Sequence, residues 1–264
     1  MGEFDSSLTR VQPVFDELIE RDPTGRSWLR DLLQAAPHAD VLPREILEEP
    51  GELLPAVAGP HPEGKASRAC FEHAALPPED LLRWSIENAH ALRWPDGRAG
   101  EFGAETESKR RALVGSDAGV VREALAELDR AGASGATRKW WAFEGITRVD
   151  CWLETDRLVL FVEGKRTEPL SSKTAWLPAR NQLARNLDAI RNERGEKAGV
   201  VLLAVEANVE EPSDDELREA APHLGESAAE ELRSRYLGQL TWQDICESTG
   251  IDFQSLPNRV GDRD

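Results

Sequence analysis

The sequence predicts a mixed α/β protein in which helices surround a central β-sheet. Two observations support this fold class. Between residues 139 and 205, short segments rich in aromatic and β-branched residues are separated by turn signals, which is typical of strands. Before and after this region, apolar residues recur at the three-to-four-residue spacing of helices. The 264 residues are therefore expected to form a helical N-terminal region (1–100), a core (101–206) and an acidic helical C-terminal extension (207–264).

The composition is that of a globular protein without membrane segments. Hydrophobic residues make up 40% and charged residues 31% of the chain. No apolar run approaches the roughly 20 residues that a membrane-spanning helix needs. The cysteines Cys70, Cys151 and Cys246 are far apart and form no CxxC pair, so neither a disulfide framework nor a zinc site is expected. We therefore expect a cytoplasmic protein with no membrane partner.

The N-terminal region is expected to contain helices joined by irregular chain. Helical spacing of apolar residues covers 5–20 and 27–35, and two prolines begin another helix over 77–92. Prolines and glycines make 37–78 mostly irregular, apart from a short helix near 44–49. This region carries no recognisable catalytic motif, and it is a candidate surface for a protein partner or a homodimer.

The core is expected to follow the order α, β, β, β, α, β. Its three consecutive strands form an antiparallel meander, and its last strand is fully apolar, as in a buried strand. The expected helices lie at 104–114, 117–131 and 178–193, and the expected strands at 139–143, 147–154, 157–165 and 199–205. In the extension, helices are expected at 214–224, 227–237 and 241–248.

Three charged residues on adjacent predicted strands form a candidate catalytic site. Glu163 and Lys165 share one face of their strand, and Asp150 on the neighbouring strand can lie beside Glu163 at about 5 Å. Two carboxylates this close repel each other unless a cation lies between them, and Mg²⁺ or Mn²⁺ accepts few carboxylates with retained waters. Such a site activates water beside a phosphate, and Lys165 would orient that water. The alternative is a surface ion pair of Asp150 with Lys165 or Arg148.

The distribution of charge favours a local phosphate-binding surface. The net charge of −17 opposes general attraction to nucleic acid. However, basic residues outnumber acidic ones over 164–198, directly after the candidate site, whereas 205–231 is strongly acidic. The acidic extension could also occupy the basic surface as an autoinhibitor. The candidate phosphate contacts in the basic segment are Arg166, Lys173, Arg180 and Arg185.

The motifs VDCWLET and VEGK, the αβββαβ order and a helix with a glutamine-led polar face resemble the PD-(D/E)XK nuclease superfamily over residues 104–206. The resemblance implies a restriction-endonuclease-like core with a mixed central sheet and Mg²⁺-dependent endonuclease activity, with DNA as the expected partner. Asp150 and Glu163 correspond to the metal ligands, Lys165 to the motif lysine and Gln182 to a helical glutamine of some branches. Arg185 stands where exonuclease-like branches carry a tyrosine.

The resemblance also implies a glutamate on the first core helix. Glu107 is the expected residue, with Glu105 and Glu123 as competitors, and Glu144 at the end of the first meander strand is a further candidate metal ligand. Solvated helix charges and a turn residue are the structural alternatives for these positions. For the whole chain, the alternative to a nuclease is a non-catalytic module that uses the same fold for binding or assembly.

Overall fold

A five-stranded mixed β-sheet forms the centre of the computed structural model, which describes residues 5–55, 69–94, 103–135, 139–166, 170 and 174–261. The strands lie in the order β1-β2-β3-β4-β5. The first two junctions are antiparallel, and the β3–β4 and β4–β5 junctions are parallel. The strand bounds are β1 Ala69–Ala75, β2 Thr147–Glu154, β3 Leu158–Gly164, β4 Ala198–Val205 and β5 Tyr236–Thr241. The predicted mixed α/β class with a mixed sheet is therefore confirmed.

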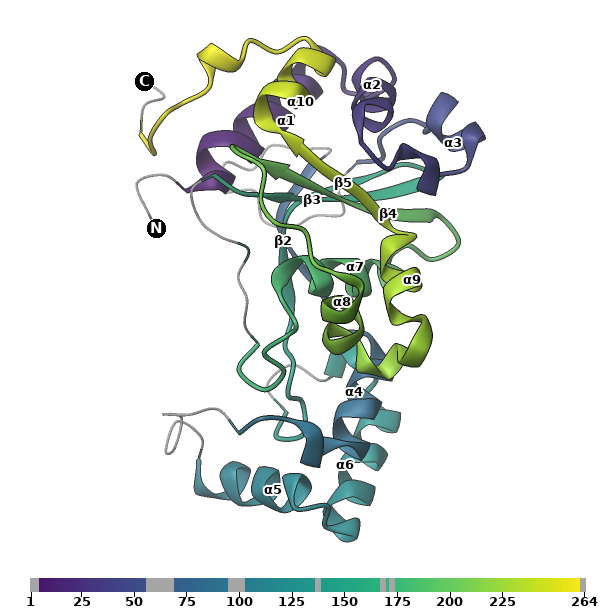
Figure 1. The fold of residues 1–264 in the computed structure, drawn as a ribbon, viewed down its shortest axis with the longest axis vertical. Coiled ribbons are helices and arrows are strands. Elements are labelled where there is room, and N and C mark those ends of the chain that lie inside the picture. Colours follow the sequence, from purple (N-terminus) through teal and green to yellow (C-terminus); the bar gives the residue numbers. More distant parts are fainter. Residues whose placement is uncertain are drawn as a thin grey trace.

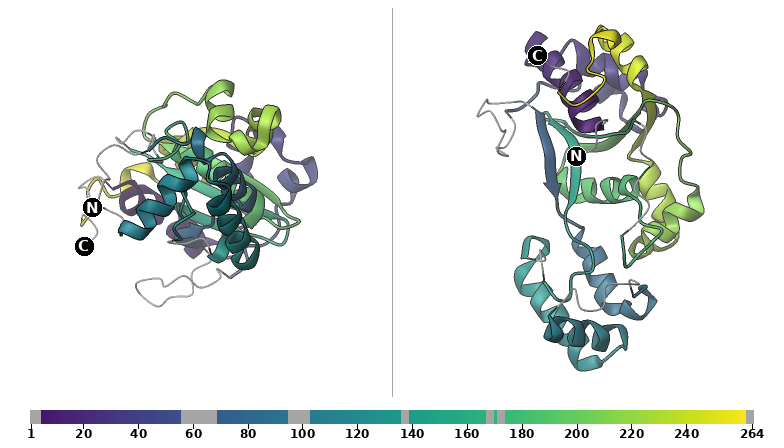
Figure 2. Two further views of the ribbon diagram at one scale, coloured as in Figure 1. Left: turned by 90° about the horizontal axis from the view of Figure 1, so that it is seen from below. Right: turned by 90° about the vertical axis from the view of Figure 1, so that its left-hand side faces the viewer.

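Helices cover both faces of the sheet (Figures 1 and 2). One face packs against α1 (Gln12–Arg21), α2 (Trp28–Ala35) and α10 (Trp242–Thr249), through a core that includes side chains of β2, β3 and β4. The other face packs against α7 (Gln182–Glu193), α8 (Asp214–Ala220) and α9 (Ala228–Arg233). Because both faces are covered, β3 is buried along its whole length, as its continuous apolar sequence predicts.

A separate helical lobe lies below the sheet in Figure 1. It consists of α4 (Glu79–Glu87), α5 (Ala104–Val114) and α6 (Ala118–Ala131), which surround their own apolar core. In sequence, the lobe is an insertion between β1 and β2, the two strands that extend toward it (Figure 2). The shorter helices are η1 Ser7–Val11, η2 Ala39–Val41, α3 Arg44–Glu48, η3 Ala89–Ala91, η4 Ala133–Gly135, η5 Pro222–Ser227 and η6 Phe253–Ser255. Within the described ranges, no helix has the length and apolar character needed to cross a membrane.

Three element predictions are wrong, and all three errors concern strands. The segment 139–143 forms turns, because Trp141 and Phe143 pack into the core of the helical lobe. The first antiparallel strand is β1, which lies in the segment expected to be irregular. The helix expected over 227–237 ends at Arg233, and the following residues pair with β4 as β5.

The predicted region boundaries at residues 100 and 206 do not separate the sheet from its surroundings. Strand β1 comes from the predicted N-terminal region, and β5 comes from the predicted C-terminal extension. Within 104–206 the longer elements follow the order α5, α6, β2, β3, α7, β4, so two strands and not the predicted three precede α7. The third antiparallel strand is β1, which precedes the helical lobe in sequence.

Candidate active site

Asp150 lies where the ladder between β2 and β3 ends. The last paired residues are Cys151 and Val162, and beyond them the Asp150 Oδ2 atom accepts a hydrogen bond of 2.8 Å from the Gly164 backbone N–H. The side-chain alternation of β2 also breaks here. Val149 packs on the α7 side of the sheet, whereas Cys151 packs on the α1 side. Asp150 therefore occupies an irregularity in the strand, with its side chain directed to the end of β3.

Glu163 is completely buried near the end of β3, and its carboxylate accepts three hydrogen bonds. Lys165 Nζ donates to Oε1 at 2.5 Å, while Gln182 Nε2 and Asn186 Nδ2 donate to Oε2 at 3.0 Å and 2.9 Å. The Asn186 side chain is itself fixed, because its Oδ1 accepts a 3.1 Å hydrogen bond from Thr147 Oγ1. Three donors from two segments, the end of β3 and helix α7, thus hold the carboxylate in one orientation.

The backbone around Lys165 is anchored by neighbouring elements. Its N–H donates to the Ala204 carbonyl at 2.7 Å, and its carbonyl accepts from Trp242 Nε1 at 3.1 Å and from the Glu206 N–H at 3.1 Å. The Lys165 residue is only 7% exposed. Parallel pairing with β4 and packing of α10 therefore position the ammonium group beside the two carboxylates.

The electrostatics of the site favour an additional positive charge. Burial, together with repulsion from Glu163, raises the pKa of Asp150 to about 8, although Lys165 opposes the increase. Burial also raises the pKa of Glu163, against the opposing effect of Lys165 and Asn186. One ammonium group thus faces two buried carboxylates, and burying an uncompensated charge is costly.

The donor set fits a hard divalent cation such as Mg²⁺ or Mn²⁺. Such ions take oxygen ligands and often bind through one or two carboxylates, with waters or substrate completing the shell. Asp150 and Glu163 supply carboxylate oxygens, and Asp150 Oδ1 has no hydrogen-bond partner among the residues that the structure describes. In those same residues, no group of three or more His, Cys, Asp or Glu side chains is arranged to hold a metal ion. Water or substrate would therefore have to complete a site built on these two carboxylates.

The structure does not bring the two other predicted metal ligands to this site. Glu107 lies on α5 in the helical lobe and pairs with Arg111 at 2.6 Å. Glu144 is buried, and its two oxygens accept from Arg180 at 2.5 Å and 3.0 Å. Both expectations are corrected, because each carboxylate is paired with an arginine.

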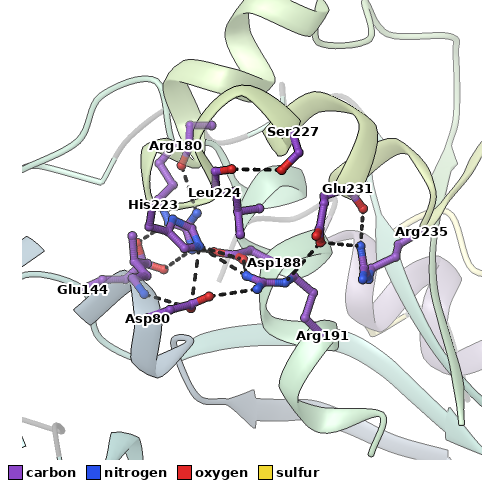
Figure 3. Close-up of polar contacts among 12 residues, drawn as sticks. Asp80, Glu144, Arg180, Asp188, Arg191, His223, Leu224, Ser227, Glu231 and Arg235 are labelled. Carbon is purple, nitrogen blue, oxygen red and sulfur yellow. Dashed lines mark hydrogen bonds and ion pairs between the residues drawn. The ribbon is translucent and has the colours of Figure 1, made fainter. Parts of the chain in front are cut away.

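Arg180 belongs to a buried ion network instead of a phosphate-binding surface (Figure 3). Its guanidinium is fully buried between Glu144 and Asp188, which accepts from Arg180 at 2.8 Å. Burial would raise the pKa of Asp188, but Arg180, His223 and Arg191 together outweigh that effect, so this pKa lies well below its usual range. Asp188 also contacts His223 at 3.2 Å and Arg191 at 2.7 Å. A guanidinium enclosed in this way is inaccessible to a nucleic-acid phosphate, which corrects the prediction for Arg180.

The remaining predicted phosphate contacts are also largely engaged within the protein. Arg166 donates to Thr9 Oγ1 at 3.2 Å and to the Asn258 carbonyl at 2.7 Å. Arg185 donates to the Ile146 carbonyl at 2.9 Å, and its side chain is 21% exposed. Lys173 lies outside the described residues. The described arginines of the basic segment after β3 that were expected to contact phosphate therefore bond mainly to other elements of the protein.

Asn186 is a site residue that the sequence analysis missed. It lies one helical turn after Gln182 on α7, at the i+4 spacing that places two side chains on the same helix face. Its contact with Glu163 could have been predicted from that spacing, whereas the i+3 residue Arg185 points to the loop before β2.

Comparison of the chain with protein-family models, with curated proteins and with solved structures found no match.

Proposed function

We propose that this chain is a divalent-metal-dependent nuclease that hydrolyses phosphodiester bonds, with DNA as the expected substrate. The observation that carries the proposal is the convergence of Asp150, Glu163 and Lys165 at the end of β3, with Glu163 held by α7. The three antiparallel strands β1, β2 and β3, followed by α7 and β4, support a restriction-endonuclease-like core. In this proposal, the helical lobe is an insertion into that core.

The metal ion would be held by Asp150 and Glu163. When bound, it supplies positive charge that polarises the scissile phosphate and offsets the charge that develops during hydrolysis. Lys165 holds a second positive charge at the same place and can donate a hydrogen bond to the attacking water or to a phosphate oxygen. Gln182 and Asn186 position the Glu163 carboxylate, so that it does not reorient when substrate enters.

The test is cleavage of linear duplex, single-stranded and branched DNA, and of RNA, in the presence of Mg²⁺ or Mn²⁺. Asp150→Asn and Lys165→Ala should each lower the cleavage rate by about 100-fold or more, since each removes a group expected to contact the reacting phosphate or its metal. Lys197→Ala is the matched control. Lys197 also pairs with a strand glutamate, Glu154 at 2.5 Å, but it lies at the opposite end of the sheet. Cleavage that survives both site substitutions would refute the proposal.

A second candidate is a non-catalytic binding or assembly module. It is favoured by the net charge of −17 and by the internal bonding of the three described arginines expected to contact phosphate, Arg166, Arg180 and Arg185. Isothermal titration with Mn²⁺ separates the two candidates. A protein that binds no Mn²⁺, and whose partner binding survives Glu163→Gln, would support the binding module.

A further inference from the structure

Glu72 on β1 lies across from Asp150. The pairs on either side are Phe71 with Cys151 and His73 with Val149, so Glu72 and Asp150 face each other where the ladder between β1 and β2 is interrupted. The backbones of neighbouring strands lie about 5 Å apart. On the side of β2 away from β3, the neighbouring strand is β1, and it places Glu72 near Asp150. The segment that contains β1 was expected to be irregular.

The backbone at Glu72 has an uncommon conformation for its residue type. Its φ is +54°, in the left-handed region that non-glycine residues rarely occupy, and it is an interior residue of a strand. The alternation of side chains along β1 breaks here, because residues two apart lie on opposite faces of the sheet. Phe71 packs on the α1 face, whereas His73 contacts Trp152 on the α7 face, at a ring-centroid distance of 4.1 Å. Strand β2 changes face at Asp150. The two irregularities therefore coincide across the strand pair.

The side chain of Glu72 is exposed, and within the described part of the chain its carboxylate has no hydrogen-bond or ion-pair partner. Its backbone carbonyl accepts a 3.1 Å hydrogen bond from Arg148 Nη1, which holds the main chain in place. Burial is the main cause of the raised pKa values of Asp150 and Glu163, and the negative charge of Glu72 adds a smaller increase to both. Glu72 is thus a free carboxylate on a fixed backbone, within electrostatic reach of both candidate metal ligands.

We propose that Glu72 is a third carboxylate of the divalent-cation site and turns toward Asp150 and Glu163 when the cation binds. This inference rests on the proposed nuclease function, because it extends the metal site of that function. The three carboxylates do not form a ready ligand group among the residues described here, so binding requires the exposed Glu72 side chain to rotate. The left-handed backbone of Glu72 lies across from Asp150, and the exposed side chain is free to rotate toward it.

The test is isothermal titration of the full chain with Mn²⁺, combined with thermal unfolding in EDTA. Glu72→Gln should weaken Mn²⁺ binding about tenfold, which corresponds to about 1.4 kcal/mol. Glu45→Gln on α3 is the matched control: it removes the same charge from an exposed helix residue and should leave Mn²⁺ binding unchanged. Glu72→Gly should weaken Mn²⁺ binding as much as Glu72→Gln and also raise the unfolding temperature in EDTA, because glycine adopts positive φ without strain.

The outcomes distinguish failure of this inference from failure of the proposed function. If the wild type binds Mn²⁺, Asp150→Asn abolishes binding and Glu72→Gln binds like Glu45→Gln, then the role of Glu72 is refuted while the metal site stands. If the wild type binds no Mn²⁺, both proposals are refuted. A purely structural Glu72 would alter the unfolding temperature of its variants without altering their Mn²⁺ affinity.

Discussion

Substituting Asp150 with asparagine should stabilise the metal-free protein at neutral and alkaline pH. The asparagine carries no charge, and its Oδ1 can still accept the hydrogen bond that Gly164 N–H donates to Asp150. In the wild type, burial and the neighbouring Glu163 raise the pKa of Asp150 from 3.8 to about 8. Ionising Asp150 in the folded protein is therefore unfavourable, and the substitution removes this cost.

The pH dependence follows from the direction of the shift. Because the pKa of Asp150 is higher in the folded than in the unfolded chain, the folded state binds more protons between pH 3.8 and about 8. The contribution of Asp150 to stability is fully present below pH 3.8 and is lost as the pH rises to about 8. At about 1.4 kcal/mol per pH unit, the loss has an upper limit of about 6 kcal/mol. Water entry and side-chain rearrangement reduce such penalties, so we expect about 2–3 kcal/mol.

The assay is urea unfolding of both proteins in EDTA from pH 5 to pH 8.5. The advantage of Asp150→Asn in the free energy of unfolding should be small at pH 5 and should increase to its plateau near pH 8. Saturating Mn²⁺ should reverse the order, since a ligand that binds only the folded wild type stabilises it. A variant that is less stable than the wild type at every pH, or an advantage that does not grow with pH, would refute the reasoning.

Three further predictions concern groups around the site. Asn186→Ala should lower Mn²⁺ affinity by about 10–100-fold in isothermal titration, because it removes a donor that orients Glu163; unchanged affinity would exclude this positioning role. Arg180→Met should destabilise the protein by about 3–5 kcal/mol in urea unfolding, because it removes the buried positive charge that two buried carboxylates share; a loss below about 1 kcal/mol would contradict the buried network. Gly164→Ala should cost about 1–3 kcal/mol in the same assay, because its Cβ would lie 2.4 Å from Val11 Cγ2; a neutral result would show that η1 can move away from β3.

The prediction of the strand pair β2 and β3 succeeded because its signals are local. Aromatic and β-branched residues between turn signals identified β3 over 157–165, and residues two apart on a strand share a face, so Glu163 and Lys165 had to lie together. The same reasoning about faces assigned Asp150 by strict alternation, but β2 changes face at this residue. Asp150 still reaches the site, through its hydrogen bond to Gly164.

The errors arose where a partner far away in the sequence decides the structure. The aromatic segment 139–143 has the composition of a strand, but the helical lobe offers it a different apolar surface. Arg180 was expected to contact phosphate because it lies in a basic segment of the sequence, but the carboxylates of Glu144 and Asp188 enclose it. The residue type predicts which interactions a side chain can make. It does not predict which residue from a distant part of the sequence will lie next to that side chain in the fold.

The sequence by itself determined the mixed α/β class, the two central strands and the placement of Glu163 and Lys165 on one strand face, because periodicity and spacing along one element are short-range properties. Only the tertiary structure decided that β1 joins β2 across an inserted helical lobe, and that Glu72 therefore lies opposite Asp150. The register between these strands depends on packing against both faces of the sheet, and residues more than 70 positions apart carry no local signal of that pairing.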